Sequence, residues 1–289
     1  MDFHHPLFQS LVLPLVSAFV LTGVLRALLG PGAGARWAAL GLPLALLVTL
    51  SWVLGWRMPP SGLTEKLPWV VLAATVSGVV LESLRADRRA QWLAAGLLWA
   101  LIIVALGRQP MLPGIGSWLV GMAVIGAVVY EVPSRADAAA MLAIAGAGLA
   151  VMAMMSGSAL FFELSLGLAA ATAGTALWLW PVPRISLGAG GLLAAVLAWL
   201  SLAQGTALLT SVRPGAVLTL AASFCSAALL RLLRRRLRRG ESHAWAEALV
   251  VAAVAAVWVA AGLAIAQWVG PPRGGDAKAP DSPYYTPKW

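Results

Sequence analysis

The chain has 289 residues, of which 61% are hydrophobic and only 11% are charged, and its formal net charge is +9. This composition excludes an ordinary water-soluble domain, because a large fraction of a soluble protein's surface must stay polar. Lipid is therefore the expected solvent for much of the chain. The basic residues lie at the ends of apolar runs, a pattern that is typical of membrane topology and argues against nucleic-acid binding.

Ten apolar segments approach the roughly 20 residues that a helix needs to cross about 30 Å of hydrocarbon. They are continuous apolar runs, whereas barrel strands alternate in pieces of about ten residues. We therefore predict an all-α, polytopic transmembrane helical bundle over 1–269, with about ten spans. Two long apolar stretches, 138–180 and 185–230, are each read as two helices, so eight or nine spans are the alternatives. The expected spans are 8–29, 37–56, 67–84, 92–106, 115–130, 138–155, 159–180, 185–203, 214–230 and 245–269.

Ten spans would divide into two groups of five. An odd number of spans in each half gives the halves opposite orientations, which is the organisation of an inverted-repeat transporter. We find no clear internal sequence similarity between 8–130 and 138–269, so this 5+5 organisation is predicted from the span number alone.

Prolines interrupt the first two spans, at Pro14 and Pro43. Each removes a backbone donor and can kink its helix. Irregular backbone is tolerated at membrane depth only beside protein or water, so kinked helices often line a pathway. Both prolines are therefore candidates for a substrate pathway, and ordinary proline-containing spans are the alternative.

Few polar side chains are expected at membrane depth, and the clearest is Glu163, about one turn inside the seventh span. An ionisable group in hydrocarbon costs about 2.5–3.5 kcal/mol unless it is paired or hydrated. Glu163 is thus a candidate proton or cation site, or a partner of Arg108 or Arg213. An interfacial carboxylate that reaches water is the alternative. Gln204 and Gln267 either bond neighbouring helices or mark a polar path.

Carboxylates near the predicted helix ends have ordinary explanations. Glu82 precedes Arg85 by three residues, a helical spacing that favours a local ion pair. Glu247 faces the arginine-rich loop that precedes the tenth span, and a local ion pair is expected there as well.

This arginine-rich loop orients the chain, because short loops rich in Lys and Arg stay in the cytoplasm. Thirteen of the twenty basic residues then fall at odd-numbered loops, four at even-numbered loops and three in the C-terminal tail. We therefore expect a bacterial-type inner-membrane protein with both termini in the periplasm. The loop is expected to bind anionic lipid headgroups as a topological anchor, and regulated binding of lipid or of an acidic partner is the alternative. Its basic residues are Arg231, Arg234, Arg235, Arg236, Arg238 and Arg239.

The tail over 270–289 is rich in proline and glycine, so we predict a disordered periplasmic segment. Its aromatic residues Tyr284, Tyr285 and Trp289 are candidates for docking a protein partner. Folding of these rings back onto the membrane interface is the alternative.

Catalytic motifs are scarce. The three histidines lie outside the predicted spans, and we recognise no metal-binding or nucleophile motif, so no cofactor or metal site is predicted. The leading hypothesis is a secondary transporter or permease-like protein for a small solute. A noncatalytic membrane subunit or scaffold of a larger complex is the alternative, followed by a membrane-embedded enzyme.

Overall fold

The computed structural model describes residues 7–60, 62–106, 111–237 and 244–268, and every regular element in these residues is a helix. Short π-helical or 3-10 turns precede or join several α-helices. The α-helices are α1 (Leu13–Leu28), α2 (Ala35–Trp37), α3 (Gly41–Leu54), α4 (Leu67–Ser83), α5 (Arg88–Leu106), α6 (Met111–Val129), α7 (Asp137–Met155), α8 (Ala159–Ala176), α9 (Ala189–Leu209), α10 (Pro214–Ala221), α11 (Ser226–Leu237) and α12 (Ala244–Trp268).

Nine helical stretches among the described residues are long and apolar enough to cross a membrane. The described residues also contain a shorter apolar stretch, Pro113–Val129 in α6, which is consistent with about ten spans. The second span, Gly30–Leu54, contains α2 and α3, and the ninth, Pro214–Arg236, contains α10 and most of α11. The prediction of an all-α polytopic bundle is confirmed, and the chain is a multi-pass integral membrane protein.

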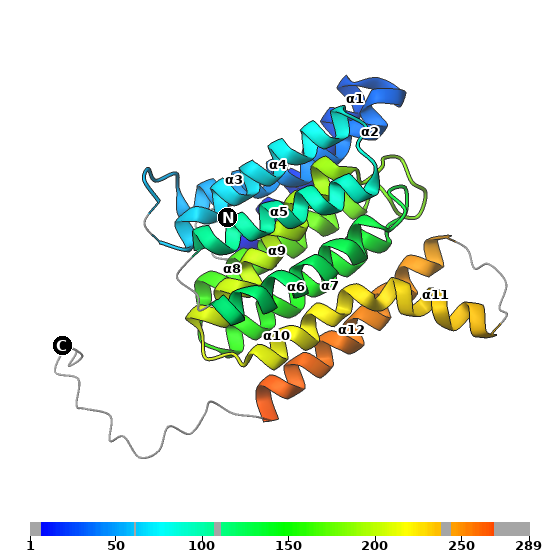
Figure 1. The fold of residues 1–289 in the computed structure, drawn as a ribbon. Coiled ribbons are helices and arrows are strands. Elements are labelled where there is room, and N and C mark those ends of the chain that lie inside the picture. The colour runs from blue at the N-terminus through cyan, green and yellow to red at the C-terminus, as the bar shows by residue number, and fades with distance from the viewer. Residues whose placement is uncertain (1–6, 61, 107–110, 238–243, 269–289) are drawn as a thin grey trace, which may run out of the picture.

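Helix α9 forms the centre of the bundle. About 78% of the residues in its most apolar stretch are buried, against 17% for the first span and 22% for the last. It packs against α4 most extensively, and also against α5, α6 and α8. Figure 1 shows α12 at one edge of the bundle and α9 among the inner helices. A site beside α9 is therefore surrounded by protein.

Small residues let the helices approach closely. A Cβ atom on Gly78 in α4 would lie 2.6 Å from the carbonyl oxygen of Ala189 and 2.7 Å from Cα of Gly190. A Cβ atom on Gly41 would lie 2.7 Å from Cα of Thr22 in α1. Such backbone contacts are typical of helix pairs in membranes, where close packing replaces a hydrophobic driving force.

The predicted eighth span, 185–203, is wrong at both ends. Helix α9 begins at Ala189, because Gly188 is extended, and it continues to Leu209. Polar residues near its end suggested a loop, but hydroxyls such as that of Thr206 donate to carbonyls of the same helix. Gln204, which the sequence placed in a connection, therefore lies inside α9.

Both prolines of the first two spans are buried where the helix type changes. Pro14 follows the π-helical turn Phe8–Val12, and Pro43 follows the 3-10 turn Ala38–Leu40. The physical reason is that proline cannot donate to the carbonyl four residues earlier.

The 5+5 organisation stays a prediction. Helices α1 and α7 begin the two predicted halves, but their packing partners differ. Helix α1 packs mainly on α3 and α8, whereas α7 packs mainly on α8 and α12.

Candidate functional site

The first, third, fifth and seventh connections between spans lie at one end of the bundle, which we call the polar end (Figure 1). The seventh connection donates backbone hydrogen bonds to Ala35 in α2 and to the fifth connection, and an arginine that follows the third connection also donates to the fifth. These bonds are Ser186 N–H to Ala35 O at 2.8 Å, Leu187 N–H to Pro133 O at 2.7 Å, and Arg88 Nη1 to Tyr130 O at 2.7 Å.

Glu82 links three helices at the polar end. Its carboxylate is nearly buried, forms an ion pair with Arg36 at 3.3 Å, and accepts the N–H of Gly190 at 3.1 Å. A carboxylate is favoured there, because Gly190 belongs to the first turn of α9. The expected ion pair with Arg85 is not formed, since Arg85 adopts a left-handed conformation (φ 51°) in the turn after α4.

Four arginines of the predicted arginine-rich loop, Arg231, Arg234, Arg235 and Arg236, lie in helix α11 and not in a loop, and Arg231 is held by a buried carboxylate. Its Nη1 and Nη2 atoms donate to the two oxygens of Glu131 at 2.8 and 2.6 Å. Burial raises the pKa of Glu131, in the connection between α6 and α7, even though Arg231 acts in the opposite direction. The pair attaches α11 to that connection.

A second set of ion pairs attaches α11 to α12. Glu247 accepts from Arg234 at 3.1 Å and from Arg135 at 2.5 Å, and Arg135 also contacts Asp137 at 2.8 Å. The local pairing expected for Glu247 is therefore present. In the described part of the chain, no group of three or more His, Cys, Asp and Glu side chains is placed to share a metal ion.

Other arginines of the cluster have no such role in the structure. Arg235 and Arg236 are exposed, and Arg238 and Arg239 lie outside the described residues. Lipid binding by the cluster stays a prediction. The tail residues Tyr284, Tyr285 and Trp289 also lie outside the described residues, as does Arg108.

A cavity of about 380 Å³ lies at the polar end, and we call it the polar cavity. Its wall includes the carboxylates of Glu82 and Glu131, each of which forms an ion pair with an arginine. Five helices and two connections contribute the remaining residues, which are Arg36, Arg88, Gln91, Val128, Val129, Val132, Pro133, Ala138, Ser186, Leu187, Gly188, Ala189 and Leu192.

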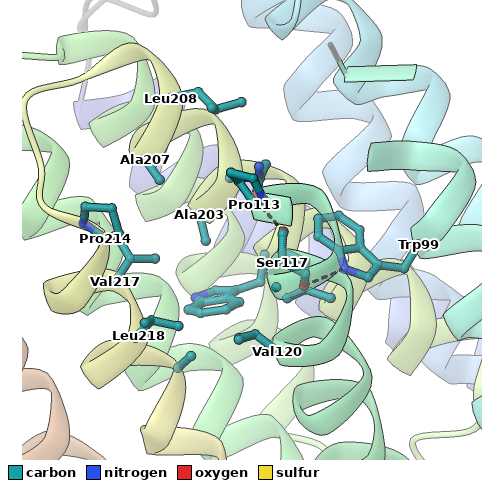
Figure 2. Close-up of a pocket in the computed structure, with 15 residues that line it drawn as sticks. Trp99, Pro113, Ser117, Val120, Ala203, Ala207, Leu208, Pro214, Val217 and Leu218 are labelled. Atoms are coloured by element: carbon teal, nitrogen blue, oxygen red, sulfur yellow. Dashed lines mark hydrogen bonds between the residues drawn. The ribbon is translucent and has the colours of Figure 1, made fainter. Parts of the chain in front are cut away.

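A larger cavity of about 510 Å³ lies toward the other end, between α5, α6, α9 and α10, and we call it the apolar cavity. Figure 2 shows Ser117 of α6 facing Pro214, Val217 and Leu218 of α10 across it. The Ser117 hydroxyl donates to Oε1 of Gln204 at 2.6 Å. The complete lining is Trp99, Pro113, Gly116, Ser117, Val120, Trp199, Leu200, Ala203, Gln204, Ala207, Leu208, Pro214, Val217, Leu218 and Ala221.

Tryptophans fasten α5 to α6 beside this cavity. Each indole N–H donates to a backbone carbonyl of the opposite helix, and glycines make room for the rings. A Cβ atom on Gly121 would overlap the indole nitrogen of Trp99, and one on Gly126 would lie 3.1 Å from that of Trp92. The bonds are Trp92 Nε1 to Met122 O at 2.9 Å, Trp99 Nε1 to Ser117 O at 3.2 Å, and Trp118 Nε1 to Gly96 O at 3.0 Å.

The two cavities lie along the same three helices. On α9 the polar cavity ends at Leu192 and the apolar cavity begins at Trp199, a separation of roughly 10 Å at 1.5 Å per residue. The intervening residues of α9, from Leu193 to Ala198, are all buried. Two closely packed helical turns therefore separate a cavity at one end of the bundle from a cavity at the other.

The structure brings only one of the predicted pathway residues, Gln204, into either cavity. Glu163 is half-buried in α8, forms no hydrogen bond or ion pair with the described residues, and lines neither cavity. Pro14 and Pro43 are buried away from both cavities, and Gln267 is exposed near the end of α12. A pathway role for these four residues stays a prediction.

Sequence reasoning missed Ser117, Trp99 and Trp199. All three lie inside spans, where an isolated serine or tryptophan carries little signal. One indication was that a serine in the fifth span and a glutamine after the predicted eighth span each need a hydrogen-bond partner at depth.

No protein-family model matches this sequence, and no curated protein sequence matches it either.

Proposed function

We propose that this chain is a secondary transporter or permease-like protein for a small solute, and that its pathway runs between α5, α6 and α9. The observation that carries the proposal is the pair of cavities at opposite ends of these helices, with about two turns of packed residues between them. Alternating access needs such a barrier, which shifts so that a site faces one side at a time.

We also propose that the protein lies in a bacterial-type inner membrane with the polar end in the cytoplasm and both termini in the periplasm. Charge supports this orientation. Among the described residues, basic side chains at the polar end are Arg26, Arg36, Arg85, Arg88, Arg89, Arg135, Arg184, Arg231, Arg234, Arg235 and Arg236, against Arg57, Lys66 and Arg213 at the other end. A periplasm-active phosphatase fused after the last residue should be active, and an inactive fusion of a stably expressed chain would reverse the orientation.

Uptake by proteoliposomes tests the transport function. Liposomes with the native chain, with Gln204→Ala or with Ser83→Ala are incubated with a pool of small metabolites, and their contents are measured by mass spectrometry. Ser83→Ala is the control, because Ser83 is an exposed polar residue of α4 that lines neither cavity. At least one compound should enter faster with the native chain and the control than with Gln204→Ala or empty liposomes. Equal entry in all four preparations contradicts transport and favours the scaffold alternative.

Side-specific labelling tests the pathway. The chain has one cysteine, Cys225, which is exposed, so labelling begins from a Cys225→Ser background. A single cysteine at Gln91 in the polar cavity should react with a membrane-impermeant maleimide from the cytoplasmic side only. One at Ala207 in the apolar cavity should react from the periplasmic side only. Reaction of both positions from the same side would contradict a pathway with two mouths.

A further inference from the structure

The lining of the apolar cavity is electrically neutral. None of its fifteen residues is charged, and aliphatic, proline and tryptophan side chains make most of its wall. Its volume of about 510 Å³ lies within the range of roughly 300–1,000 Å³ that small-molecule sites have. Transfer of an ion into such a wall without a counter-charge is costly, so the cavity suits a neutral molecule with an apolar body.

The polar atoms in this neutral wall include unused hydrogen-bond donors. Trp199 is 1% exposed, and its indole nitrogen has no acceptor among the described residues. Gln204 uses its Oε1 to accept from Ser117, and its amide nitrogen forms no hydrogen bond with the described residues. The indole nitrogen of Trp199 is itself covered by protein, whereas the Gln204 amide lines the cavity, so a ligand oxygen that accepts from this amide would be stabilised.

We propose that the apolar cavity binds a neutral molecule that has an apolar body and a carbonyl or ether oxygen, with the oxygen accepting from the amide of Gln204. Leu208 and Leu218 of the lining are 45% and 50% exposed, so apolar side chains continue from the cavity to the surface of the protein. The identification of this ligand as a transported substrate rests on the proposed function, whereas the binding itself does not.

Binding can be measured with prodan, a neutral fluorescent naphthalene that carries one ketone. Energy transfer from tryptophan to prodan is recorded for the purified chain in lipid nanodiscs, with empty nanodiscs as background. Saturable transfer is expected for the native chain, because Trp99 and Trp199 line the cavity. Transfer that rises linearly with prodan, as in lipid alone, would overturn the proposal.

A matched pair of glycine variants places the binding in this cavity. A Cβ atom on either Gly116 or Gly114 meets nothing within 4 Å, but only Gly116 lines the cavity. Gly116→Phe should abolish saturable binding and Gly114→Phe should retain it. Ala207→Phe fills the cavity from α9 and should also abolish saturable binding. The two filled variants allow the test to be made even if one of them does not fold. Native binding by both filled variants would overturn the assignment.

Competition tests the chemistry of the ligand. The neutral ketone 2-acetylnaphthalene should displace prodan, and its anionic counterpart 2-naphthoate should not. The hydrocarbon 2-ethylnaphthalene lacks an acceptor and should displace prodan roughly threefold to tenfold more weakly than the ketone, the change expected for one hydrogen bond. Gln204→Leu should reduce that preference. Equal displacement by the ketone and the hydrocarbon, or by the ketone and the anion, would contradict the proposed ligand class.

The outcomes separate this proposal from the proposed function. Binding of the neutral ketone by a chain that moves no solute would leave the site and refute transport. Uptake of a solute that depends on Gln204 but is unaffected by Gly116→Phe would leave transport and refute binding in the apolar cavity.

Discussion

Substitution of Gly121 by alanine should separate α5 from α6. Gly121 lies opposite the indole of Trp99, and a Cβ atom there would overlap the indole nitrogen and lie 2.9 Å from Cε2. Trp99 is 1% exposed but lines the apolar cavity, so its ring can yield toward that cavity or the two helices can move apart. The added methyl group must push the ring or the helix away, and the hydrogen bond from Trp99 to the carbonyl of Ser117 lengthens as a result.

The size of the effect follows from three contributions. Overpacking of a filled interior costs about 1–3 kcal/mol. Loss of the indole hydrogen bond costs about 0.5–1.5 kcal/mol. Alanine is better than glycine inside a helix by about 1 kcal/mol, which offsets part of this cost. The free energy of unfolding should therefore fall by about 0.5–3.5 kcal/mol.

Gly116→Ala is the matched control, because Gly116 precedes Gly121 by five residues on α6 and its added Cβ atom meets nothing within 4 Å. Thermal unfolding of both variants and of the native chain is followed by tryptophan fluorescence in the same detergent. Gly121→Ala should unfold at a lower temperature than the native chain, and Gly116→Ala at the same or a higher one. Equal unfolding temperatures for the two variants would refute the close packing of Trp99 against α6.

Three further predictions concern the charged groups. Glu82→Ala leaves the buried N–H of Gly190 without its acceptor and removes the carboxylate partner of Arg36, which keeps its bond to the backbone carbonyl of residue 82, so it should cost about 1–3 kcal/mol. Glu163→Ala should change stability by less than about 0.5 kcal/mol. Similar unfolding temperatures for the two variants would refute the role of Glu82. The pKa of Glu131 is raised on folding, so the folded chain binds this proton more tightly than the unfolded chain. The stability of the native chain relative to Glu131→Gln should therefore rise as the pH falls from the folded pKa toward the ordinary value of 4.5, as measured by unfolding temperatures at several pH values. A decrease in relative stability over this range would mean that the ion pair with Arg231 outweighs burial. Arg231→Lys should lower the free energy of unfolding by about 0.5–1 kcal/mol, because lysine cannot form the bidentate pair with Glu131. Arg235→Lys should leave the free energy of unfolding unchanged, because Arg235 is exposed and forms no such pair with the described residues. Equal effects of the two substitutions would contradict the role of Arg231 in holding α11 against the connection between α6 and α7.

The fold was largely predictable because hydropathy alone identifies apolar helices. The boundaries were less so, as α9 demonstrates. Gln204 and Thr206 suggested a loop by their polarity, yet hydroxyls can bond to carbonyls of the same helix and an amide can bond to a neighbouring one. Ile185 was assigned to the span because it is apolar, although it is buried in the connection before α9. Apolar character reports burial in lipid or protein, and it does not report helix.

The charges were predictable in their position along the chain but not in their partners. The arginine-rich loop was expected to act through its charge alone. Arg231 and Arg234 instead form ion pairs with carboxylates of other segments, while Arg235 is exposed. Glu131, the partner of Arg231, is 100 residues away in the sequence, so no local spacing could indicate the pair. Topological orientation and packing are separate demands, and the same basic residues are able to meet both.

The apolar cavity was the least predictable feature, because it depends on how each helix is rotated about its axis. In a soluble protein an apolar stripe shows which face of a helix is buried. In a membrane both the lipid-facing and the protein-facing sides are apolar, so this signal disappears. Trp92 and Trp118, near the ends of their predicted spans, fit an interfacial position equally well. A more specific signal was the glycines of α6, because Gly121 and Gly126 are positions against which indole rings of α5 pack. Rotation of a membrane helix is therefore better judged from its smallest residues than from its most hydrophobic ones.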